Sequence, residues 1–308
     1  TGGQKLHGSI QPQGAKNEVL QILCATLLTE ETVRVSNIPD IVDVNQLIDI
    51  LKDFGVVVTK HGLGDYSFCA KNVNSDFLFS ETYRVKGASL RGSVMLVGPM
   101  LARFGKGYIP KPGGDKIGRR RLDTHFLGFM KLGAEYKHKE GTEFYGVEAP
   151  KSGLKGSYIL LDEASVTGTA NIVMAAVFTP GTTSIYNAAC EPYLQQLCNM
   201  LVRMGAKIDG IGSNLLHIHG VKSLGSTEHR CLPDMIEIGS WIGLAAMTQS
   251  SITIKNAGVE HLGQIPQVFR KLGIQLEIQG DDIHVPAQSH YTIGSYLDGS
   301  MVTISDAP

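Results

Sequence analysis

The pattern of apolar and polar positions repeats along the chain. Each of four segments combines an apolar helix, a short β-branched strand and a second, amphipathic helix that ends at a glycine. The closing glycines are Gly55, Gly133, Gly205 and Gly273, separated by 78, 72 and 68 residues. Glycine suits the left-handed conformation that ends many helices, because it has no β-carbon to clash there. The sequence therefore predicts a structural unit of roughly 70 residues that occurs four times.

The helices and strands of this unit differ in their hydrophobic pattern. The first helices are apolar on nearly every side, which is typical of buried helices. The strands that follow them alternate apolar with polar residues, which indicates a sheet with one face in water. We therefore expect helices inside and sheets outside, the inverse of the usual α/β layering. The first helices are predicted at 18–28, 92–97, 171–178 and 241–247, and the strands at 32–37, 182–187 and 251–256.

Chain size and composition indicate a packed protein with more than one domain. The chain has 308 residues and a mass of 33.2 kDa, about twice the usual size of one domain. Apolar residues make up 43% and charged residues 19%, which excludes long disorder and coiled coil. We predict the crossover between two domains near 228–233, with the strand before Gly14 joining the later domain.

The cysteines and the apolar stretches favour a cytosolic protein. None of the five cysteines forms a CxxC pair, so neither a zinc site nor a disulfide framework is indicated. Cys24 and Cys198 lie in helical apolar patterns and are expected to pack in the core. The longest nearly apolar stretch, 94–102, is too short to span a membrane, and the N-terminus has no signal-peptide pattern.

Positive charge is concentrated in one segment of a chain whose net charge is -1. Between Arg84 and Arg121 there are ten basic residues and a single acid, Asp115. Such a surplus repels itself unless an anion or facing carboxylates relieve it, so a polyanionic ligand is favoured over a solvated basic face. Nucleic acid is disfavoured, because only Phe104 and Tyr108 are available for base stacking. The basic residues are Arg84, Lys86, Arg91, Arg103, Lys106, Lys111, Lys116, Arg119, Arg120 and Arg121.

Within this segment, residues 110–118 are predicted to form a loop. Two prolines and three glycines surround Asp115, which makes the segment a poor helix or strand. It could be a hinged loop that closes over a ligand and carries Asp115 with it, or an ordinary surface turn. Glu191, which precedes Pro192, could contact this loop or a substrate, or act in a turn; the pattern leaves both open.

Other residues that could carry chemistry are assigned structural roles. His217 and His219 share one strand face, but no third ligand is apparent, so surface placement is favoured over a metal site. The segment Gly210-Ile-Gly212 is predicted to be a turn, because it lacks the third glycine of a dinucleotide loop. Asp234 is expected to cap a helix rather than to form a catalytic pair with Glu237.

Several short motifs occur in a fixed order from Gly2 to about Ile304. They are Gly14-Ala-Lys-Asn17, Arg91-Gly-Ser-Val94, Leu101-Ala-Arg-Phe-Gly105, Pro112-Gly-Gly-Asp-Lys-Ile-Gly118, Arg120 with Asp123 and His125, Ser165-Val166, Asn187-Ala-Ala-Cys-Glu-Pro192 and Leu232-Pro-Asp-Met-Ile-Glu237. Together they resemble the UDP-N-acetylglucosamine 1-carboxyvinyltransferases, a family of enolpyruvyl transferases. The ordered combination is highly specific.

The resemblance implies a fold and a reaction. The fold is α/β, with two inside-out barrels of three repeats each: a complete barrel at 16–230 with a lid loop at 110–119, and a partial second barrel from 1–15 and 231–308. The reaction transfers the enolpyruvyl group of phosphoenolpyruvate to the 3'-hydroxyl of UDP-N-acetylglucosamine through a tetrahedral intermediate, and releases phosphate. This is the first committed step of bacterial peptidoglycan synthesis. No cofactor, metal, nucleic acid or membrane partner is expected, and the oligomeric state stays open.

The resemblance also implies roles for individual residues. Lys16 and Arg120 would hold the phosphate and carboxylate of phosphoenolpyruvate, while Asn17 would position the reacting hydroxyl and Arg91 would complete the cationic pocket. A second set would line the uridine diphosphate site: Arg120, Arg121, Leu122, Asp123, Thr124, His125, Ser165 and Val166. Preorganised charge in this cluster is expected to account for most of the reduction in the activation free energy.

Asp115 departs from the usual family pattern, in which the lid carries a cysteine. The resemblance makes Asp115 the acid that protonates the methylene carbon, a role that needs a positioned proton donor. A carboxylate is a weaker nucleophile than a thiolate. We therefore expect insensitivity to the epoxide fosfomycin, which alkylates the cysteine of the family.

The family also continues for roughly a hundred residues beyond Pro308, and that portion supplies a carboxylate general base and further arginines. We expect either a longer native protein or a fragment that binds without turnover, in which the apolar helix at 241–247 is partly uncovered. Two rival functions remain at this point: 5-enolpyruvylshikimate-3-phosphate synthase, which shares the architecture, and a noncatalytic sugar-nucleotide binding protein.

Overall fold

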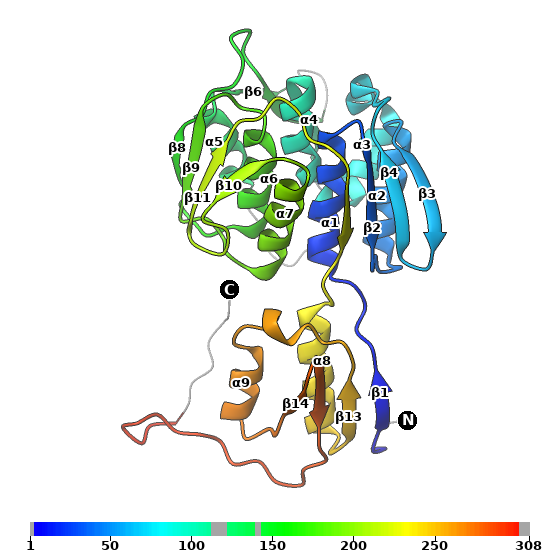
Figure 1. Cartoon of the computed structure of the whole chain (residues 1–308), viewed down its shortest axis with the longest axis vertical. Helices are drawn as coiled ribbons and strands as arrows, with labels where there is room; N and C mark the ends of the chain where they lie inside the picture. The colour runs from blue at the N-terminus through cyan, green and yellow to red at the C-terminus, as the bar shows by residue number, and fades with distance from the viewer. Residues whose placement is uncertain (1–2, 112–121, 139–142, 302–308) are drawn as a thin grey trace. The chain divides into compact units, whose positions relative to one another are not determined.

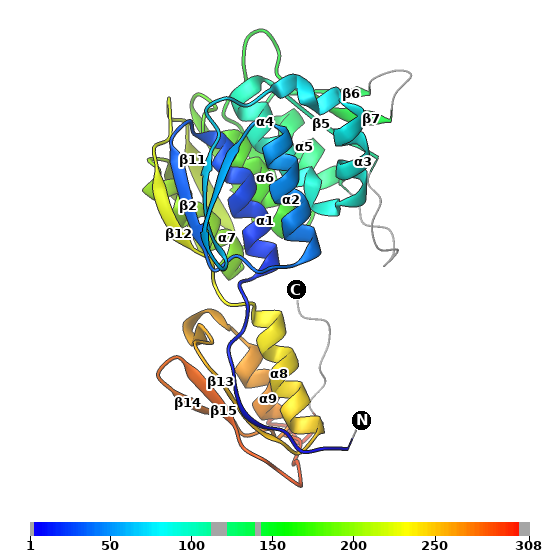
Figure 2. The same cartoon turned by 90° about the vertical axis from the view of Figure 1, so that its right-hand side faces the viewer.

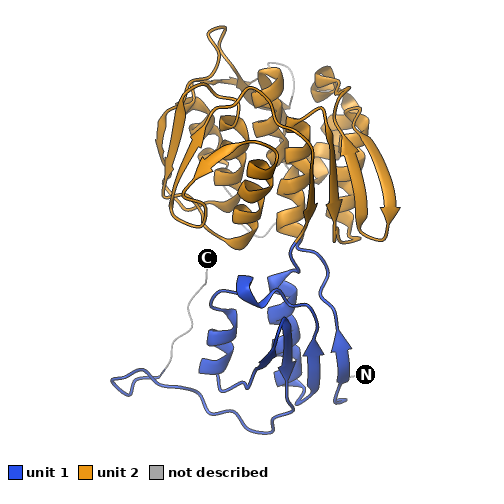
Figure 3. Ribbon diagram, viewed as in Figure 1, with its two compact units in different colours: residues 1–15, 232–308 blue, residues 16–231 orange. Residues whose placement is uncertain are grey.

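A computed structural model describes residues 3–111, 122–138 and 143–301 (Figure 1). Two compact units follow from the contacts within the chain. Unit 1 combines residues 1–15 and 232–308, and unit 2 comprises residues 16–231 (Figure 3). Asp115, Arg120 and Arg121 lie outside the described residues, as does the predicted lid from residue 112 onwards. No helix among the described residues has the length and apolar character needed to cross a membrane.

The described residues of unit 2 form three separate sheets. Their strand orders are β12-β2-β4-β3, β5-β7-β6 and β10-β11-β9-β8. The strands are β2 Thr32–Ser36, β3 Val57–Gly62, β4 Asp65–Cys69, β5 Lys106–Pro110, β6 Glu135–His138, β7 Phe144–Glu148, β8 Tyr158–Leu160, β9 Thr182–Tyr186, β10 Lys207–Asp209, β11 Leu215–His219 and β12 Thr227–Arg230. Buried and exposed residues alternate along β2 and β9, as the sequence pattern predicts.

The helices of unit 2 lie between these sheets (Figures 1 and 2). They are α1 Lys16–Ala25, η1 Thr26–Leu28, α2 Val42–Asp53, η2 Ser75–Phe79, α3 Glu81–Ser89, η3 Arg91–Leu96, α4 Val97–Phe104, α5 Asp123–Lys131, α6 Val166–Ala176 and α7 Pro192–Arg203. The central helices α1, α4 and α6 are buried over most of their length, and α6 contacts both of the others. The predicted inside-out arrangement is therefore confirmed, although the three sheets are not hydrogen-bonded into one closed barrel.

The repeat is visible in the backbone. Gly55, Gly133, Gly205 and Gly273 all have positive φ, between 83° and 111°, so the predicted left-handed helix caps are confirmed. Three asparagines also have positive φ: Asn37 after β2, Asn187 after β9 and Asn256 shortly after β13, which is Ser251–Ile254. Asparagine tolerates this conformation better than most residues. The second unit differs, since its predicted first helix begins as the 3₁₀ helix η3 and continues as α4.

The C-terminal ends of the three central helices meet at one cavity of about 620 Å³. Its lining includes Leu28 just after α1, Arg103 in the last turn of α4 and Phe178 just after α6. Arg103 donates hydrogen bonds to the carbonyl oxygens of Leu27, at 3.1 Å, and of Ala70, at 2.6 Å. The cavity therefore lies at the C-terminal ends of these helices, and the predicted site residues Lys16 and Ser165 lie at the N-terminal ends of α1 and α6.

Unit 1 is a single helix-covered sheet with the strand order β1-β13-β15-β14. Its elements are β1 His7–Ile10, α8 Met235–Met247, β13 Ser251–Ile254, η4 Val259–His261, α9 Ile265–Lys271, β14 Glu277–Gln279 and β15 Asp282–Val285. The side chain of Asp234 accepts hydrogen bonds from the backbone N–H groups of Ile236 and Glu237, so the predicted cap is confirmed. Met247 is 88% exposed at the end of α8.

Candidate functional site

The predicted site residues of unit 2 begin its helices. Lys16 begins α1, Arg91 begins η3, Asp123 begins α5, and Ser165 is the N-cap of α6. Helix η3 contacts both α1 and α6, and α5 contacts α6, so these helix starts belong to neighbouring elements. Positive charge and unpaired N–H groups gather at helix N-termini, which makes such an end favourable for anions.

Lys16 forms an ion pair that the motif alone does not reveal. Its Nζ lies 3.0 Å from the Oδ2 of Asp43, which is on the first turn of α2. Both side chains are a little over two-fifths exposed, so water screens the pair. Neighbouring Asn17 is exposed. Asp43 therefore orients Lys16 without removing it from solvent.

His125 is buried in a polar network between helices. Its Nδ1 lies 3.0 Å from the Nδ2 of Asn171, and its Nε2 lies 3.3 Å from the Oγ1 of Thr167. Burial lowers the pKa of His125 to about 4, and the nearby charge of Arg91 acts in the same direction. His125 is therefore neutral at pH 7 and can serve as a hydrogen-bonding group but not as a cation.

The first turn of α6 is fixed by its cap and by α5. The Ser165 hydroxyl accepts a hydrogen bond from the backbone N–H of Gly168 at 3.2 Å. Thr124 donates from its hydroxyl to the Oε1 of Glu163 at 2.9 Å, which ties α5 to the segment before α6. Thr167, next to Val166, is exposed. The structure thus brings Thr124, His125, Ser165 and Val166 to adjoining helix starts.

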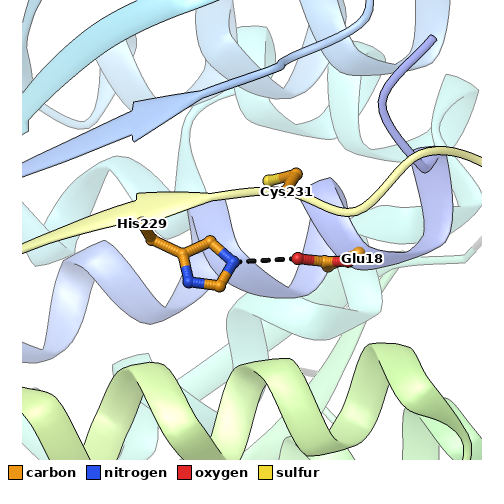
Figure 4. Close-up of side chains that lie close together, drawn as sticks. All are labelled: Glu18, His229 and Cys231. Atoms are coloured by element: carbon orange, nitrogen blue, oxygen red, sulfur yellow. Dashed lines mark hydrogen bonds and ion pairs between the residues drawn. The ribbon is translucent and has the colours of Figure 1, made fainter. Parts of the chain in front are cut away.

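A second buried cluster joins Glu18, two residues after Lys16, to residues more than 200 positions later, and the sequence pattern does not reveal it. Glu18, His229 and Cys231 place a carboxylate, an imidazole and a thiol within 4.8 Å of one another (Figure 4). All three residues are buried. Glu18 comes from the first turn of α1, while His229 and Cys231 come from β12 and the residue just beyond it. Carboxylate, imidazole and thiolate groups together are a donor set that zinc accepts.

The hydrogen bonds of this cluster favour protons over a metal ion. The guanidinium of Arg203 donates to the Nδ1 of His229 at 2.7 Å, so that nitrogen must accept and the ring proton resides on Nε2. Nε2 then donates to the Oε1 of Glu18 at 2.8 Å. Burial raises the pKa of the Cys231 thiol well above its usual range. A protonated nitrogen and a protonated thiol are poor ligands, so these residues do not fit a metal.

Much of the described basic segment is neutralised by carboxylates. Four of its members form ion pairs with acids from other parts of the sequence: Arg84 with Glu143, Lys86 with Asp53, Arg103 with Glu30, and Lys106 with Asp76. Arg84 also pairs with Glu81. The prediction of a single anion-binding segment from Arg84 to Arg121 is therefore too broad, because charge counting cannot locate facing carboxylates.

The residues that were predicted to have structural roles have the following surroundings in the structure. His217 and His219 lie on β11 and contact the hydroxyls of Ser184 and Thr182. Gly210 and Gly212 both have positive φ, as a turn requires. Cys24 and Cys198 are buried, as expected, and Glu191 is the N-cap residue of α7. Trp241, in the helix predicted at 241–247, is half-buried against the core of unit 1.

Comparisons with known proteins agree on one family. The family described as EPSP synthase (3-phosphoshikimate 1-carboxyvinyltransferase) matches residues 1–308. Two curated relatives are named UDP-N-acetylglucosamine 1-carboxyvinyltransferase. The relative from Bacteroides thetaiotaomicron is 64% identical over 307 residues, and the match covers 100% of this chain and 70% of the relative. The relative from Porphyromonas gingivalis is 59% identical with the same coverage.

Solved structures share the fold at low sequence identity. The enolpyruvyl transferase NikO from Streptomyces tendae has a TM-score of 0.79 and 18% identity, and covers 97% of this chain and 72% of that chain. The EPSP synthase from Acinetobacter baumannii has a TM-score of 0.66 and 17% identity, covering 93% of this chain and 66% of the other. At such identities the likeness shows the fold alone.

Proposed function

Because this chain belongs to the EPSP synthase family, we propose that it transfers the enolpyruvyl group of phosphoenolpyruvate to the 3'-hydroxyl of UDP-N-acetylglucosamine and releases phosphate. The observation that carries the proposal is the full-chain similarity, at 59–65% identity, to relatives named for this transfer. The same relatives favour the sugar nucleotide over shikimate-3-phosphate as acceptor. The proposed reaction is the first committed step of peptidoglycan synthesis, in the bacterial cytoplasm.

The helix starts of unit 2 suit two anionic substrates. Lys16 and Arg120 are proposed to hold the phosphate and carboxylate of phosphoenolpyruvate, with Asn17 at the reacting hydroxyl. Arg91 adds positive charge beside the buried, neutral His125. Arg121, Leu122, Asp123, Thr124, Ser165 and Val166 are proposed to line the nucleotide site. Because both substrates bring phosphate, fixed cations lower their mutual repulsion as the hydroxyl approaches the enol carbon of phosphoenolpyruvate.

Protonation of the methylene carbon is assigned to Asp115. The acceptor hydroxyl loses a proton to a base and bonds to the enol carbon, while the methylene carbon gains a proton and becomes a methyl group. Phosphate then leaves from the former enol carbon as the methyl group loses a proton to a base, which restores the double bond. We expect Asp115→Ala to abolish turnover while Asp115→Glu retains part of it. Normal phosphate release by Asp115→Ala would remove Asp115 from the mechanism. Mass spectrometry after incubation with fosfomycin is expected to show no covalent adduct.

Phosphate release with each acceptor tests the proposal. UDP-N-acetylglucosamine should support release of phosphate from phosphoenolpyruvate, and shikimate-3-phosphate should not. The opposite result would favour the EPSP synthase activity. Tight binding of the nucleotide by the protein expressed from its complete gene, without any turnover, would favour a binding protein. Calorimetry showing that neither substrate binds, alone or together, would contradict every version of the proposal.

A further inference from the structure

Asn171 is a fully buried amide whose orientation is set by two backbone groups. Its Oδ1 accepts a hydrogen bond from the N–H of Gly98 at 2.7 Å, and its Nδ2 donates to the carbonyl oxygen of Val94 at 2.8 Å. Neither backbone group can change its role, because an N–H only donates and a carbonyl only accepts. The amide is therefore held in one orientation, and its second Nδ2 hydrogen is available to His125.

This orientation fixes the tautomer of His125. The Nδ2 of Asn171 lies 3.0 Å from the Nδ1 of His125, so Nδ1 must accept and the proton of the neutral ring resides on Nε2. Nε2 then donates to the Oγ1 of Thr167, 3.3 Å away. Each group in this chain therefore donates towards the surface, from Asn171 through His125 to Thr167. The two backbone groups that hold the amide of Asn171 fix this direction.

Thr167 is the exposed end of this chain. Its hydroxyl accepts from His125 and has one hydrogen left to donate, for which the described residues offer no acceptor. Thr167 follows Ser165 and Val166, which the proposed function places in the nucleotide site. The charge of Arg91 acts on His125, so a cation lies near this chain of hydrogen bonds. The nearby carboxylate of Glu163 already accepts from the hydroxyl of Thr124. An oriented hydroxyl donor near a cation is suited to an anionic oxygen.

We propose that Asn171 is a positioning residue that, through His125, orients the Thr167 hydroxyl as a donor to a phosphate oxygen of the sugar nucleotide. This inference rests on the proposed function and adds two residues to it. The histidine must be neutral for this role, because a neutral ring accepts at one nitrogen and donates at the other. Accepting from Asn171 at Nδ1 therefore makes Nε2 the donor to Thr167. A protonated ring would donate at both nitrogens and would face the Nδ2 hydrogen of Asn171 with a second donor.

The inner part of the proposal can be tested without any substrate. Nitrogen NMR on the histidine-labelled full chain, with His125→Phe used to assign the resonance, reports which ring nitrogen of His125 carries the proton. We expect Nε2–H with a bare Nδ1 from pH 6 to pH 8. Asn171→Leu should remove this preference. A proton on Nδ1 in the wild type, or an unchanged tautomer in Asn171→Leu, would overturn the positioning role.

The outer part is tested with an isosteric pair at the exposed position. Thr167→Val keeps the shape of the side chain and loses the hydroxyl, and Thr167→Ser keeps the hydroxyl. We expect Thr167→Val to raise the KM and the calorimetric Kd for UDP-N-acetylglucosamine about tenfold, with a much smaller effect on the KM for phosphoenolpyruvate. Thr167→Ser should stay close to the wild type.

The two proposals fail in different ways. Unchanged nucleotide affinity in Thr167→Val, in a protein that turns over both substrates, contradicts the role of Thr167 and leaves the proposed function standing. A wild-type protein that neither binds nor converts the nucleotide contradicts the proposed function. In that case the NMR measurement still decides whether Asn171 sets the tautomer of His125.

Discussion

Two buried histidines of unit 2 adopt the same tautomer in different electrostatic settings. His229 accepts from the guanidinium of Arg203 and donates to the carboxylate of Glu18, so it lies between opposite charges. His125 accepts from the amide of Asn171 and donates to the hydroxyl of Thr167, both neutral. In each case an obligate donor at Nδ1 fixes the ring. The donor at Nδ1 therefore decides the tautomer, whereas the charges of the partners decide how much the ring contributes to the free energy of unfolding.

The largest loss of stability is expected from breaking the hydrogen-bonded chain of Arg203, His229 and Glu18. His229→Leu leaves the buried carboxylate of Glu18 without its imidazole donor and Arg203 without its acceptor. We expect the free energy of unfolding in urea to fall by about 3–5 kcal/mol. His217→Leu on the outer sheet is the control, since the side chain of His217 is hydrogen-bonded to the hydroxyl of Ser184. Its loss should cost about 1 kcal/mol. Similar losses in both variants would contradict the special role of the buried pair.

Lowering the pH tests whether His125 is neutral between Asn171 and Thr167 in the folded protein. The pKa of His125 is lowered from the ordinary 6.5 to about 4, first by burial and then by Arg91. Between these values the unfolded chain takes up a proton that the folded protein excludes, so stability falls as the pH falls from about 6.5 to about 4. We expect roughly 3 kcal/mol of loss from this group. The measurement is the pH dependence of urea unfolding in wild type minus that in His125→Phe, and identical curves would contradict the prediction.

A smaller loss of stability is expected from adding a side chain at Gly98, which contacts Asn171. A β-carbon on Gly98 would lie 2.3 Å from the backbone oxygen of Asn171 and 2.4 Å from its Oδ1. We expect Gly98→Ala to lower the free energy of unfolding by about 1–3 kcal/mol. Gly243→Ala on α8 is the matched control, because no atom lies within 4 Å of its added β-carbon. That control should be neutral or stabilising, since alanine favours helix over glycine.

The smallest effect is expected where opposite charges meet in water. Lys16 donates to the carboxylate of Asp43 as His229 donates to that of Glu18, but both side chains of the Lys16–Asp43 pair are more than 40% exposed. Asp43→Asn should change the free energy of unfolding by less than about 1 kcal/mol. Added salt should erase even that difference. A loss comparable to that of His229→Leu would show that exposure does not separate the two pairs.

Local signals in the sequence predicted much of the fold. Hydrophobic periodicity identified the buried helices and one-sided strands, and the four closing glycines marked the helix ends where the structure has positive φ. These features depend on residues close in sequence, so they can be recognised without the tertiary structure. The motif residues Lys16, Arg91, His125 and Ser165 were also identified from the sequence, and the structure places each at or near the start of a helix.

Only the tertiary structure decided which polar groups meet. His229 and Glu18 are 211 residues apart, and the amide of Asn171 reaches His125 and the backbone of Val94 and Gly98 across three helices. The carboxylates that neutralise Arg84, Lys86, Arg103 and Lys106 likewise come from distant segments or neighbouring turns. The chain itself determined the repeat and its helix caps, because those depend on local backbone preference. Pairing between distant residues leaves no periodic pattern, and packing alone selects the partners.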